Sequence, residues 1–181
     1  MTSNPNKARE AAEILGVEIK NLALDLPELQ VLDVAQVAAT KVAAAHEALG
    51  EPEAFVLVED SGLVIEAWNG LPGAFTKWFL QSVGNEGLLK MLSTYQDRSA
   101  RAVCAVAVAV PDGAVRVYLG EVEGSIALEP RGAQGFGWDP IFVPKGGTKT
   151  YAELGVLKHQ DSHRARALKA ARQVLHDGLE A

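Results

Sequence analysis

Cysteine is almost absent from this sequence. The 181 residues include one cysteine, Cys104, so a disulfide within the chain is excluded. Cys104 lies in the apolar run ARAVCAVAVAV, where a free thiol behaves as a small hydrophobic side chain more often than as a nucleophile. We therefore expect neither a disulfide framework nor cysteine-dependent catalysis.

Long apolar segments are also missing. No stretch reaches the roughly 18 uninterrupted apolar residues that suggest a membrane-spanning helix, and no positively charged start leads into the apolar core of a signal peptide. On these grounds we expect a cytoplasmic protein that does not insert into membranes.

Basic residues are not in excess. The chain carries 17 Lys and Arg against 23 Asp and Glu, which gives a formal net charge of -6. Nucleic-acid-binding proteins usually show clustered Lys and Arg in excess, so we do not expect a nucleic acid partner. A small anionic ligand held by a few local cations is compatible with this charge balance.

Apolar residues, in contrast, are plentiful. The chain is 48% hydrophobic, which is enough to bury the core of one domain, or of one domain with two lobes. We find no internal repeats and no low-complexity tails. We therefore expect residues 1–181 to form a single domain with one active site.

The first half of the chain alternates between helical and strand patterns. A helix is predicted over residues 4–16, a strand over 17–26, and a helix over 33–49 that begins with the capping pair Asp33 and Gln36. Two further short strands, 54–59 and 63–67, are predicted on either side of a tight turn at Asp60-Ser61-Gly62.

The second half continues this mixture. A helix interrupted near Gly84 is predicted over 76–95, and Pro111-Asp112-Gly113 is expected to join strands 100–110 and 115–119 in a hairpin. A short strand at 141–143 and a helix from about Ser162 complete the pattern. The order favours an α/β or α+β domain around a long mixed sheet and leaves the topology open.

The segment Thr2-Ser3-Asn4-Pro5-Asn6-Lys7 combines small polar residues and one cation at a predicted helix start. A helix start presents free backbone N–H groups and a partial positive charge, which together suit a phosphate. Ordinary helix capping explains the same residues.

Acidic residues stand in two predicted loops. Glu28 lies in DLPELQ, and Asp60 lies in Glu59-Asp60-Ser61-Gly62. Mg²⁺ is held by a few carboxylate oxygens and otherwise keeps water and substrate phosphates, so the two loops suit a metal–triphosphate site. Solvated turns are the alternative explanation.

A glycine-rich segment, GAQGFGWDP, spans residues 132–140, and Lys158 and Ser162-His163-Arg164 follow it. Aromatic rings between glycines offer a flat surface for a base, and charged neighbours can bind its edge or a phosphate. A turn with buried aromatic rings is the alternative. Lys41 and Lys77 suit solvated helix faces, although the apolar neighbours of Lys77 favour a functional role.

Taken together, these motifs resemble the inosine triphosphate pyrophosphatase family, also called the Ham1-like family. The similarity runs in order along nearly the whole chain, through TSNPNK, DLPELQ, VEDSGL, LPGAFTKWFL, GFGWDPIFVP, TYAEL and SHRARAL. The resemblance implies a long central sheet flanked by helices, with two lobes around a deep nucleotide-binding cleft. It also implies a homodimer.

The resemblance further implies a role for each motif. The implied phosphate contacts are Thr2, Ser3, Asn4, Pro5, Asn6, Lys7, Lys41 and Lys77. The implied contacts to the nucleotide and its base are Phe136, Gly137, Trp138, Asp139, Lys158, His163 and Arg164. Glu28 and Asp60 are implied to bind Mg²⁺, with Asp60 also the general base and Ser61 beside it.

The implied activity is hydrolysis of non-standard purine nucleoside triphosphates, namely ITP, dITP and XTP, to the monophosphate and pyrophosphate. Water attacks the α-phosphate in this scheme, and Mg²⁺ and lysines neutralise charge on the departing pyrophosphate. Donors aimed at a 6-oxo group would face the amino group of ATP unpaired, which disfavours ATP.

One feature departs from the family pattern. Members normally have a β-strand before the phosphate-binding motif, whereas this sequence starts at Met1 within the motif. If that strand is absent, we expect the phosphate loop to lose support and unpaired backbone groups to remain on the sheet.

Three other hypotheses stay open. A pyrophosphatase for pyrimidine or modified nucleotides, as in the Maf family, would share the architecture, although GFGWDP and SHR favour purines. A catalytically weak nucleotide-binding protein is disfavoured because Glu28 and Asp60 are both present. A purely structural protein would leave the ordered polar motifs without a reason.

Overall fold

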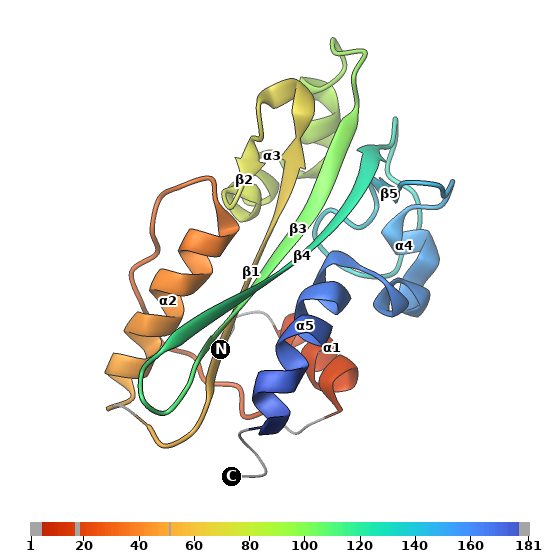
Figure 1. Ribbon diagram of the computed structural model, residues 1–181. Helices are drawn as coiled ribbons and strands as arrows, with labels where there is room; N and C mark the ends of the chain where they lie inside the picture. Colours follow the sequence, from red (N-terminus) through yellow and green to blue (C-terminus); the bar gives the residue numbers. More distant parts are fainter. Residues whose placement is uncertain (1–4, 17–18, 51, 178–181) are drawn as a thin grey trace.

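Five helices, five strands and two short 3-10 segments are found in the computed structural model, which describes residues 5–16, 19–50 and 52–177 (Figure 1). The helices are α1 (Pro5–Leu15), α2 (Val34–Ala48), α3 (Thr76–Met91), α4 (Tyr151–Leu154) and α5 (His163–Asp177). The strands are β1 (Val56–Ile65), β2 (Pro72–Gly73), β3 (Ser99–Ala109), β4 (Val115–Ile126) and β5 (Phe142–Pro144). The 3-10 segments are η1 (Glu66–Trp68) and η2 (Gly155–Gln160). No helix within the described ranges is both long and apolar enough to cross a membrane.

The strands form one sheet in the order β2-β1-β3-β4-β5. Each neighbouring pair is antiparallel, so the sheet of the described residues is antiparallel throughout, whereas the sequence predicted mixed strand directions. Figure 1 shows β1, β3 and β4 as long, twisted strands that run almost the length of the molecule. The predicted long central sheet flanked by helices is confirmed.

Apolar residues gather in three clusters around this sheet. Alternate residues of β3 face opposite sides, so Val103 and Ala105 pack with α2, while Cys104 and Val106 pack with α1 and α5. The third cluster lies at the other end of the sheet, where α3 and β5 meet buried aromatic side chains. Figure 1 shows the same division, with α2 on one side of the strands and α1 and α5 on the other.

The predicted hairpin is confirmed as β3 and β4. The two strands pair from Ser99 opposite Ser125 to Ala109 opposite Val115. Gly113 has a φ of 82°, and its N–H donates to the Val110 carbonyl at 2.8 Å, which closes the turn. The second strand continues to Ile126, well beyond the predicted end at residue 119.

The predicted turn at Asp60-Ser61-Gly62 is wrong, because one continuous strand, β1, runs through it. Residues 56–65 pair one-to-one with residues 109–100 of β3. Asp, Ser and Gly favour turns locally, but uninterrupted pairing with a long neighbour overrides that preference. Gly62 has a packing role instead, because a β-carbon there would lie 2.3 Å from the Gly73 carbonyl oxygen.

The strand predicted over 17–26 is also wrong where it can be judged. Residues 17 and 18 lie outside the described ranges, and residues 19–30 form neither helix nor strand. Leu24 and Leu26 nevertheless pack against the cluster beneath α2. The alternating leucines therefore indicated one apolar side, but a strand also needs a pairing neighbour, and none pairs with this segment among the described residues.

The helix predictions hold more closely. Asp33 caps α2 by accepting from the Ala35 N–H at 2.8 Å, and Gln36 donates to the same carboxylate at 3.1 Å. The predicted break at Gly84 is confirmed by its non-helical φ of 66° within α3. The helix ends at Met91, four residues before the predicted Tyr95.

The C-terminal predictions are confirmed with small shifts. β5 covers 142–144 where the sequence predicted 141–143, and α5 begins at His163 after Ser162, whose hydroxyl accepts from the Ala165 N–H at 3.1 Å. This cap fixes the start of α5 and so the positions of the SHR motif.

Gly62→Ala tests the role of this glycine in β1. The added methyl group would overlap the Gly73 carbonyl, so we expect a loss in the free energy of unfolding of about 3 kcal/mol. Chemical denaturation of both proteins measures the loss. Gly147→Ala is the control, because its nearest backbone atom would lie 3.3 Å away and we expect a loss below about 1 kcal/mol. Equal stability of Gly62→Ala and wild type would contradict this packing role.

Candidate active site

A cavity of about 700 Å³ lies where α1, α2, α3 and the middle of β1 meet the glycine-rich loop. Nine of the predicted site residues line it: Lys7, Glu28, Lys41, Asp60, Ser61, Lys77, Phe136, Gly137 and Trp138. These residues come from separate motifs that lie between positions 7 and 138 of the sequence. The fold thus brings predicted phosphate, metal and base contacts into one space.

The other predicted residues fall into two groups. Asp139, Lys158, His163 and Arg164 are buried beside the cavity but do not line it. Thr2, Ser3 and Asn4 lie outside the described residues, and Pro5 and Asn6 begin α1 with side chains that are not described. Within the phosphate motif, the structure therefore describes the backbone from Pro5 onward and the side chain of Lys7.

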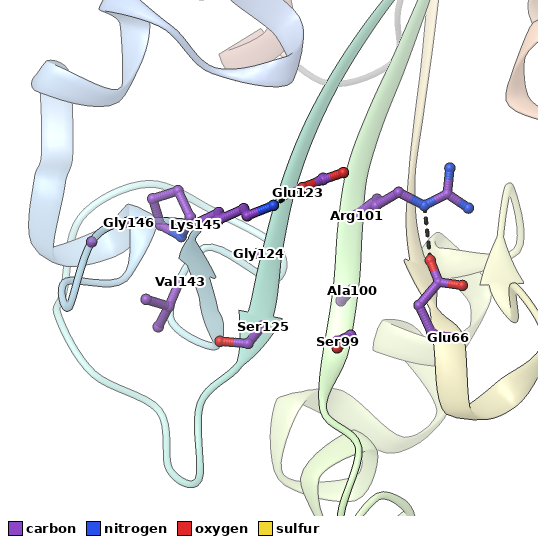
Figure 2. Close-up of a pocket in the computed structure, with 12 residues that line it drawn as sticks. Glu66, Ser99, Ala100, Arg101, Glu123, Gly124, Ser125, Val143, Lys145 and Gly146 are labelled. Atoms are coloured by element: carbon purple, nitrogen blue, oxygen red, sulfur yellow. Dashed lines mark hydrogen bonds and ion pairs between the residues drawn. The ribbon is translucent and has the colours of Figure 1, made fainter.

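A second cavity, of about 480 Å³, lies at the end of the sheet formed by β1, β3, β4 and β5 (Figure 2). Its two cations are already paired, Arg101 with Glu66 at 2.8 Å and Lys145 with Glu123 at 2.6 Å. None of the predicted site residues lines it. The second cavity therefore lacks the predicted phosphate, metal and base contacts that meet in the first.

Lys7 reaches the cavity from α1. Its ammonium donates to the Ser61 hydroxyl at 2.9 Å and forms an ion pair with Glu59 at 3.2 Å. Both partners lie on the same face of β1, two residues apart. The strand thereby fixes where the ammonium group enters the cavity.

Two carboxylates lie on the α2 side of the cavity. Lys41 extends from α2 and donates to Glu28 at 2.6 Å. Burial raises the pKa of Glu28, but the hydrogen bond and charge of Lys41 outweigh it, so the pKa lies below its ordinary value. Glu28 is therefore ionised, and a divalent cation could displace Lys41 from it.

Asp60 differs from Glu28. Burial raises the pKa of Asp60 to about 6; the charge of Lys7 opposes this rise and the charge of Glu28 adds to it. Its Oδ2 atom is buried and has no hydrogen-bond partner in the part of the chain that the structure describes. A buried carboxylate oxygen without a partner is unfavourable unless a ligand binds it, so the site fits a divalent cation between Asp60 and Glu28.

Asp60 and Glu28 are the two predicted metal ligands in the cavity, which Asp25 and Glu59 also line. Among the described residues, no group of three or more His, Cys, Asp and Glu side chains is arranged to hold a metal ion. Mg²⁺ usually keeps several waters and binds through one or two carboxylates together with substrate phosphates. The donor set thus suits a cation that arrives with a phosphorylated substrate.

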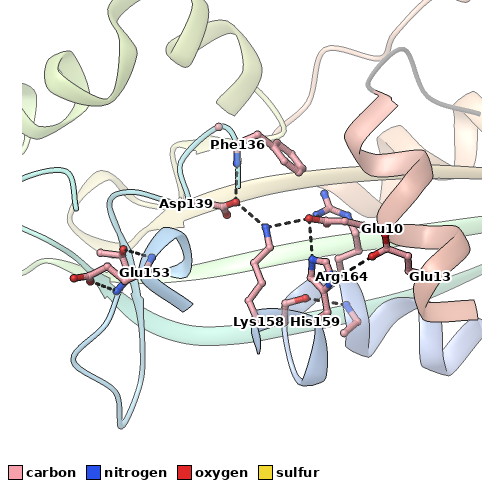
Figure 3. A network of polar contacts seen from close by, with 12 residues as sticks. Glu10, Glu13, Phe136, Asp139, Glu153, Lys158, His159 and Arg164 are labelled. Carbon is pink, nitrogen blue, oxygen red and sulfur yellow. Dashed lines mark hydrogen bonds and ion pairs between the residues drawn. The ribbon is translucent and has the colours of Figure 1, made fainter. Parts of the chain in front are cut away.

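A buried ion-pair network adjoins the cavity. Arg164 of α5 donates to Glu59 of β1 at 2.8 and 3.0 Å, and to Glu10 of α1 at 2.5 Å. Lys158 bonds Asp139 at 2.7 Å and lies 3.2 Å from Glu10 (Figure 3). The network joins α1, β1, η2, α5 and the glycine-rich loop.

The charges of this network depend on one another. Burial raises the pKa of both Glu10 and Glu59, but Arg164 with Lys158 or Lys7 outweighs it and lowers both pKa values. Burial acts in the opposite direction on Arg164, and Glu59 and Glu10 overcome it to raise the pKa of the guanidinium. Glu10, Glu59 and Arg164 are therefore charged at neutral pH.

Phe136 forms one wall of the cavity and is backed by two cations. The Lys158 ammonium lies 5.1 Å and the Arg164 guanidinium carbon 5.3 Å from its ring centroid. Cations at such distances are attracted to an aromatic face. The Asp139 carboxylate also accepts from the Phe136 N–H at 2.9 Å, so the loop that carries the ring is fixed to the network.

Trp138 and His163 hold buried polar atoms without partners. The Trp138 Nε1 atom and both His163 ring nitrogens form no hydrogen bond with residues 5–16, 19–50 and 52–177, and the two ring centroids lie 5.9 Å apart. Burial, with the charge of Arg164 adding to it, keeps the pKa of His163 well below its ordinary value, so the imidazole is neutral. A ligand edge that offers hydrogen bonds could satisfy such atoms.

Two residues of the network, Glu10 and Glu59, were not predicted as site residues from the sequence. Glu10 was not singled out, although it lies one helical turn after Lys7, because an acidic residue beside alanines also suits a solvated face. Glu59 was named only as the last residue of the predicted strand 54–59, next to a predicted turn at Asp60-Ser61-Gly62. A strand assignment would have put Glu59 with Ser61 and opposite Asp60, which is the signal that could have found it.

Cys104 has no part in this site as a nucleophile. It is fully buried in β3, and burial, together with the charge of Glu59, raises the pKa of its thiol well above the ordinary value. The thiol is therefore protonated, as expected of a small apolar residue.

A cavity that combines lysines, a buried carboxylate and an aromatic wall defines a site for a phosphorylated ligand with a flat ring. Sequence comparison agrees with this class, because the Ham1 family profile matches residues 1–174. The chain belongs to the Ham1 family.

Curated relatives and solved structures cover nearly all of the chain. A dITP/XTP pyrophosphatase from Methanopyrus kandleri is 45% identical and covers 93% of this chain and 90% of its own. An inosine triphosphate pyrophosphatase from Tuber melanosporum is 43% identical over 96% of this chain and 93% of its own. A HAM1 protein from Coxiella burnetii superposes with a TM-score of 0.83 at 32% identity, over 97% of this chain and 96% of its own.

Arg164→Met tests the buried network. The substitution leaves Glu10 and Glu59 buried without their main counter-charge, so we expect the free energy of unfolding to fall by about 3 to 5 kcal/mol at pH 7. Arg101→Met is the control, since Arg101 pairs with Glu66 and Glu121 at the surface and should lose about 1 kcal/mol or less. Urea denaturation measures both losses.

The loss should depend on pH. In the wild type, the lowered pKa values of Glu10 and Glu59 contribute stability above the ordinary glutamate pKa of 4.5, and this contribution is lost as pH falls below it. Without Arg164, burial instead favours the protonated carboxyl groups. The difference between wild type and Arg164→Met should therefore shrink between pH 6 and about pH 4, and a constant difference would contradict the assigned charges.

Proposed function

We propose that this chain hydrolyses non-standard purine nucleoside triphosphates, namely ITP, dITP and XTP, to the monophosphate and pyrophosphate, and so removes them from the nucleotide pool. The observation that carries this proposal is the shared cavity, in which Asp60 faces three lysines and the aromatic wall of Phe136 and Trp138. Its volume of about 700 Å³ lies in the usual range for a small-molecule site.

The lysines act on the phosphate chain. Lys7, Lys41 and Lys77 enter the cavity from three different helices, so they can surround a triphosphate from several sides. The motif from Thr2 to Asn6 would add backbone N–H groups at the start of α1, by resemblance to the family. These cations neutralise the charge that develops on the departing pyrophosphate.

Glu28 and Asp60 bind Mg²⁺ in this proposal, with Ser61 beside Asp60. When bound, Mg²⁺ supplies positive charge to the phosphate oxygens and makes a nearby water molecule more acidic. Asp60 accepts the proton of the water whose oxygen forms a bond to the α-phosphorus as the bond to the pyrophosphate oxygen breaks. Its pKa of about 6 leaves it mostly ionised at neutral pH and able to act as a base.

The aromatic side of the cavity would select the base. Phe136 offers a ring face, and Trp138 Nε1 is a buried donor with no partner among the residues described. His163 is neutral and can present one N–H, while Gly137, Asp139, Lys158 and Arg164 hold the loop and its rings. Donors aimed at a 6-oxo group would remain unpaired opposite the 6-amino group of ATP.

The relatives support this substrate class, since they are named dITP/XTP pyrophosphatase and inosine triphosphate pyrophosphatase. By resemblance to the family, we also propose a cytoplasmic homodimer that acts on free nucleotides. Analytical ultracentrifugation tests the dimer.

A substrate panel tests the proposed function. Pyrophosphate release is measured with Mg²⁺ and ITP, XTP, dITP, ATP, GTP, dTTP or UTP, for wild type and Asp60→Asn. We expect the 6-oxo non-standard purines to exceed ATP by at least about tenfold in kcat/KM, because an unpaired buried donor costs about 1 to 3 kcal/mol. Asp60→Asn should lose nearly all turnover.

Other outcomes would overturn the proposal. Preference for dTTP or UTP would favour a pyrimidine or modified-nucleotide pyrophosphatase. Binding of ITP by folded wild type without pyrophosphate release would indicate a nucleotide-binding protein instead. Glu123→Gln is the control for loss of a carboxylate, because Glu123 pairs with Lys145 beside the second cavity, and its turnover should equal that of wild type.

The metal requirement should depend on pH through Asp60. Protons and Mg²⁺ compete for the same carboxylate, and the pKa of Asp60 is about 6. The Mg²⁺ concentration that gives half-maximal turnover of ITP should therefore rise as pH falls from 8 to 5.5. Removal of Mg²⁺ with EDTA should abolish turnover. A half-maximal concentration that stays constant over this pH range would contradict the role of Asp60 as a metal ligand.

A further inference from the structure

Glu59 lies directly beside Asp60 and lines the cavity, but the proposed function gives it no role toward the substrate. Its side chain is 4% exposed, and both carboxylate oxygens are occupied. Oε2 accepts from Arg164 at 2.8 Å, and Oε1 accepts from Arg164 at 3.0 Å and lies 3.2 Å from the Lys7 ammonium. Both oxygens are held by protein cations, so Glu59 acts on other protein groups.

The geometry of Lys7 explains what that action is. A lysine side chain has a long, flexible stem, and its ammonium group is held only by what it contacts. Here it contacts Glu59 and Ser61, whose α-carbons lie about 7 Å apart on one face of β1. The carboxylate and the hydroxyl therefore fix the ammonium between them.

Arg164 in turn fixes Glu59. The two-pronged contact sets the plane of the carboxylate, and the third contact of Arg164 returns to Glu10 on α1. Lys7 and Glu10 are three residues apart on that helix, so they share one face. Lys7, Glu59, Arg164 and Glu10 thus form a series of alternating charges that starts on α1, passes through β1 and α5, and returns to α1.

We propose that Glu59 is a positioning residue, which holds the Lys7 ammonium in place for the phosphate chain of the substrate. This inference rests on the proposed function, since Lys7 is taken there to bind phosphate. Burial of two carboxylates and two cations is not needed for stability, because apolar residues can fill such a space equally well. These linked charges serve instead to hold the Lys7 ammonium in position at the cavity.

A double-mutant cycle between Glu59 and Lys7 tests this positioning. Turnover of ITP is measured for wild type, Glu59→Gln, Lys7→Met and the double variant. We expect Glu59→Gln to lower kcat/KM about tenfold or more in the wild-type background, because a misplaced ammonium no longer meets the phosphates. In the Lys7→Met background the same substitution should change kcat/KM by less than about twofold, since nothing remains to position.

Thermal unfolding shows whether each variant is folded. If Glu59→Gln does not fold, Glu59→Asp takes its place in the cycle, because aspartate keeps the charge but cannot reach both Arg164 and Lys7. Glu123→Gln is the matched control and should leave kcat/KM unchanged. Equal effects of the Glu59 substitution with and without Lys7, or no effect in the wild-type background, would overturn the proposal.

The same cycle run on binding separates this proposal from the proposed function. Calorimetric titration with inorganic tripolyphosphate reports phosphate binding without turnover. If wild type does not hydrolyse ITP, the proposed function fails, and non-additive losses of tripolyphosphate affinity in the cycle still support Glu59 as the positioning residue. Additive losses, or no binding of tripolyphosphate by wild type, would overturn it.

Discussion

The pairing of Arg164 with two buried carboxylates is the interaction on which the rest of the site depends. One guanidinium joins Glu10 of α1 to Glu59 of β1, while its own helix, α5, covers the same face of the sheet. A buried charge without a partner is strongly unfavourable, so these three elements can assemble only in the arrangement that satisfies all of them. The position of Lys7 follows from that arrangement.

The same network reaches the opposite wall of the cavity. Lys158 links Glu10 to Asp139, and Asp139 holds the backbone of Phe136. The phosphate side and the aromatic side are thereby connected through charged contacts that are shielded from water. Shielded ion pairs have few alternative geometries, so the cavity has a defined shape before any ligand binds.

The middle of β1 carries different functional groups on its two faces. Successive side chains point to opposite faces of a strand, so Glu59 and Ser61 face α1 and α5, while Asp60 faces the side of Glu28 and Lys41. Among the described residues, β2 pairs with β1 only at Leu63 and Val64, so the cavity can reach the strand beside Asp60. The two faces of β1 therefore carry different sets of charges. Glu59 contacts Lys7 on one face, and Asp60 lies on the side of Glu28 and Lys41 on the other.

Local pattern was sufficient for much of this protein. The helix starting after Asp33, the break at Gly84 and the hairpin turn at Gly113 depend on neighbouring residues, so the sequence predicted them correctly. The ordered motifs also identified the family and nine of the residues that line the cavity. Tertiary structure alone decided that β1 is continuous and that Glu10 and Glu59 are buried partners of Arg164. The reason is physical: strand pairing and buried ion pairs join residues far apart in the chain, and local preference carries no record of such contacts.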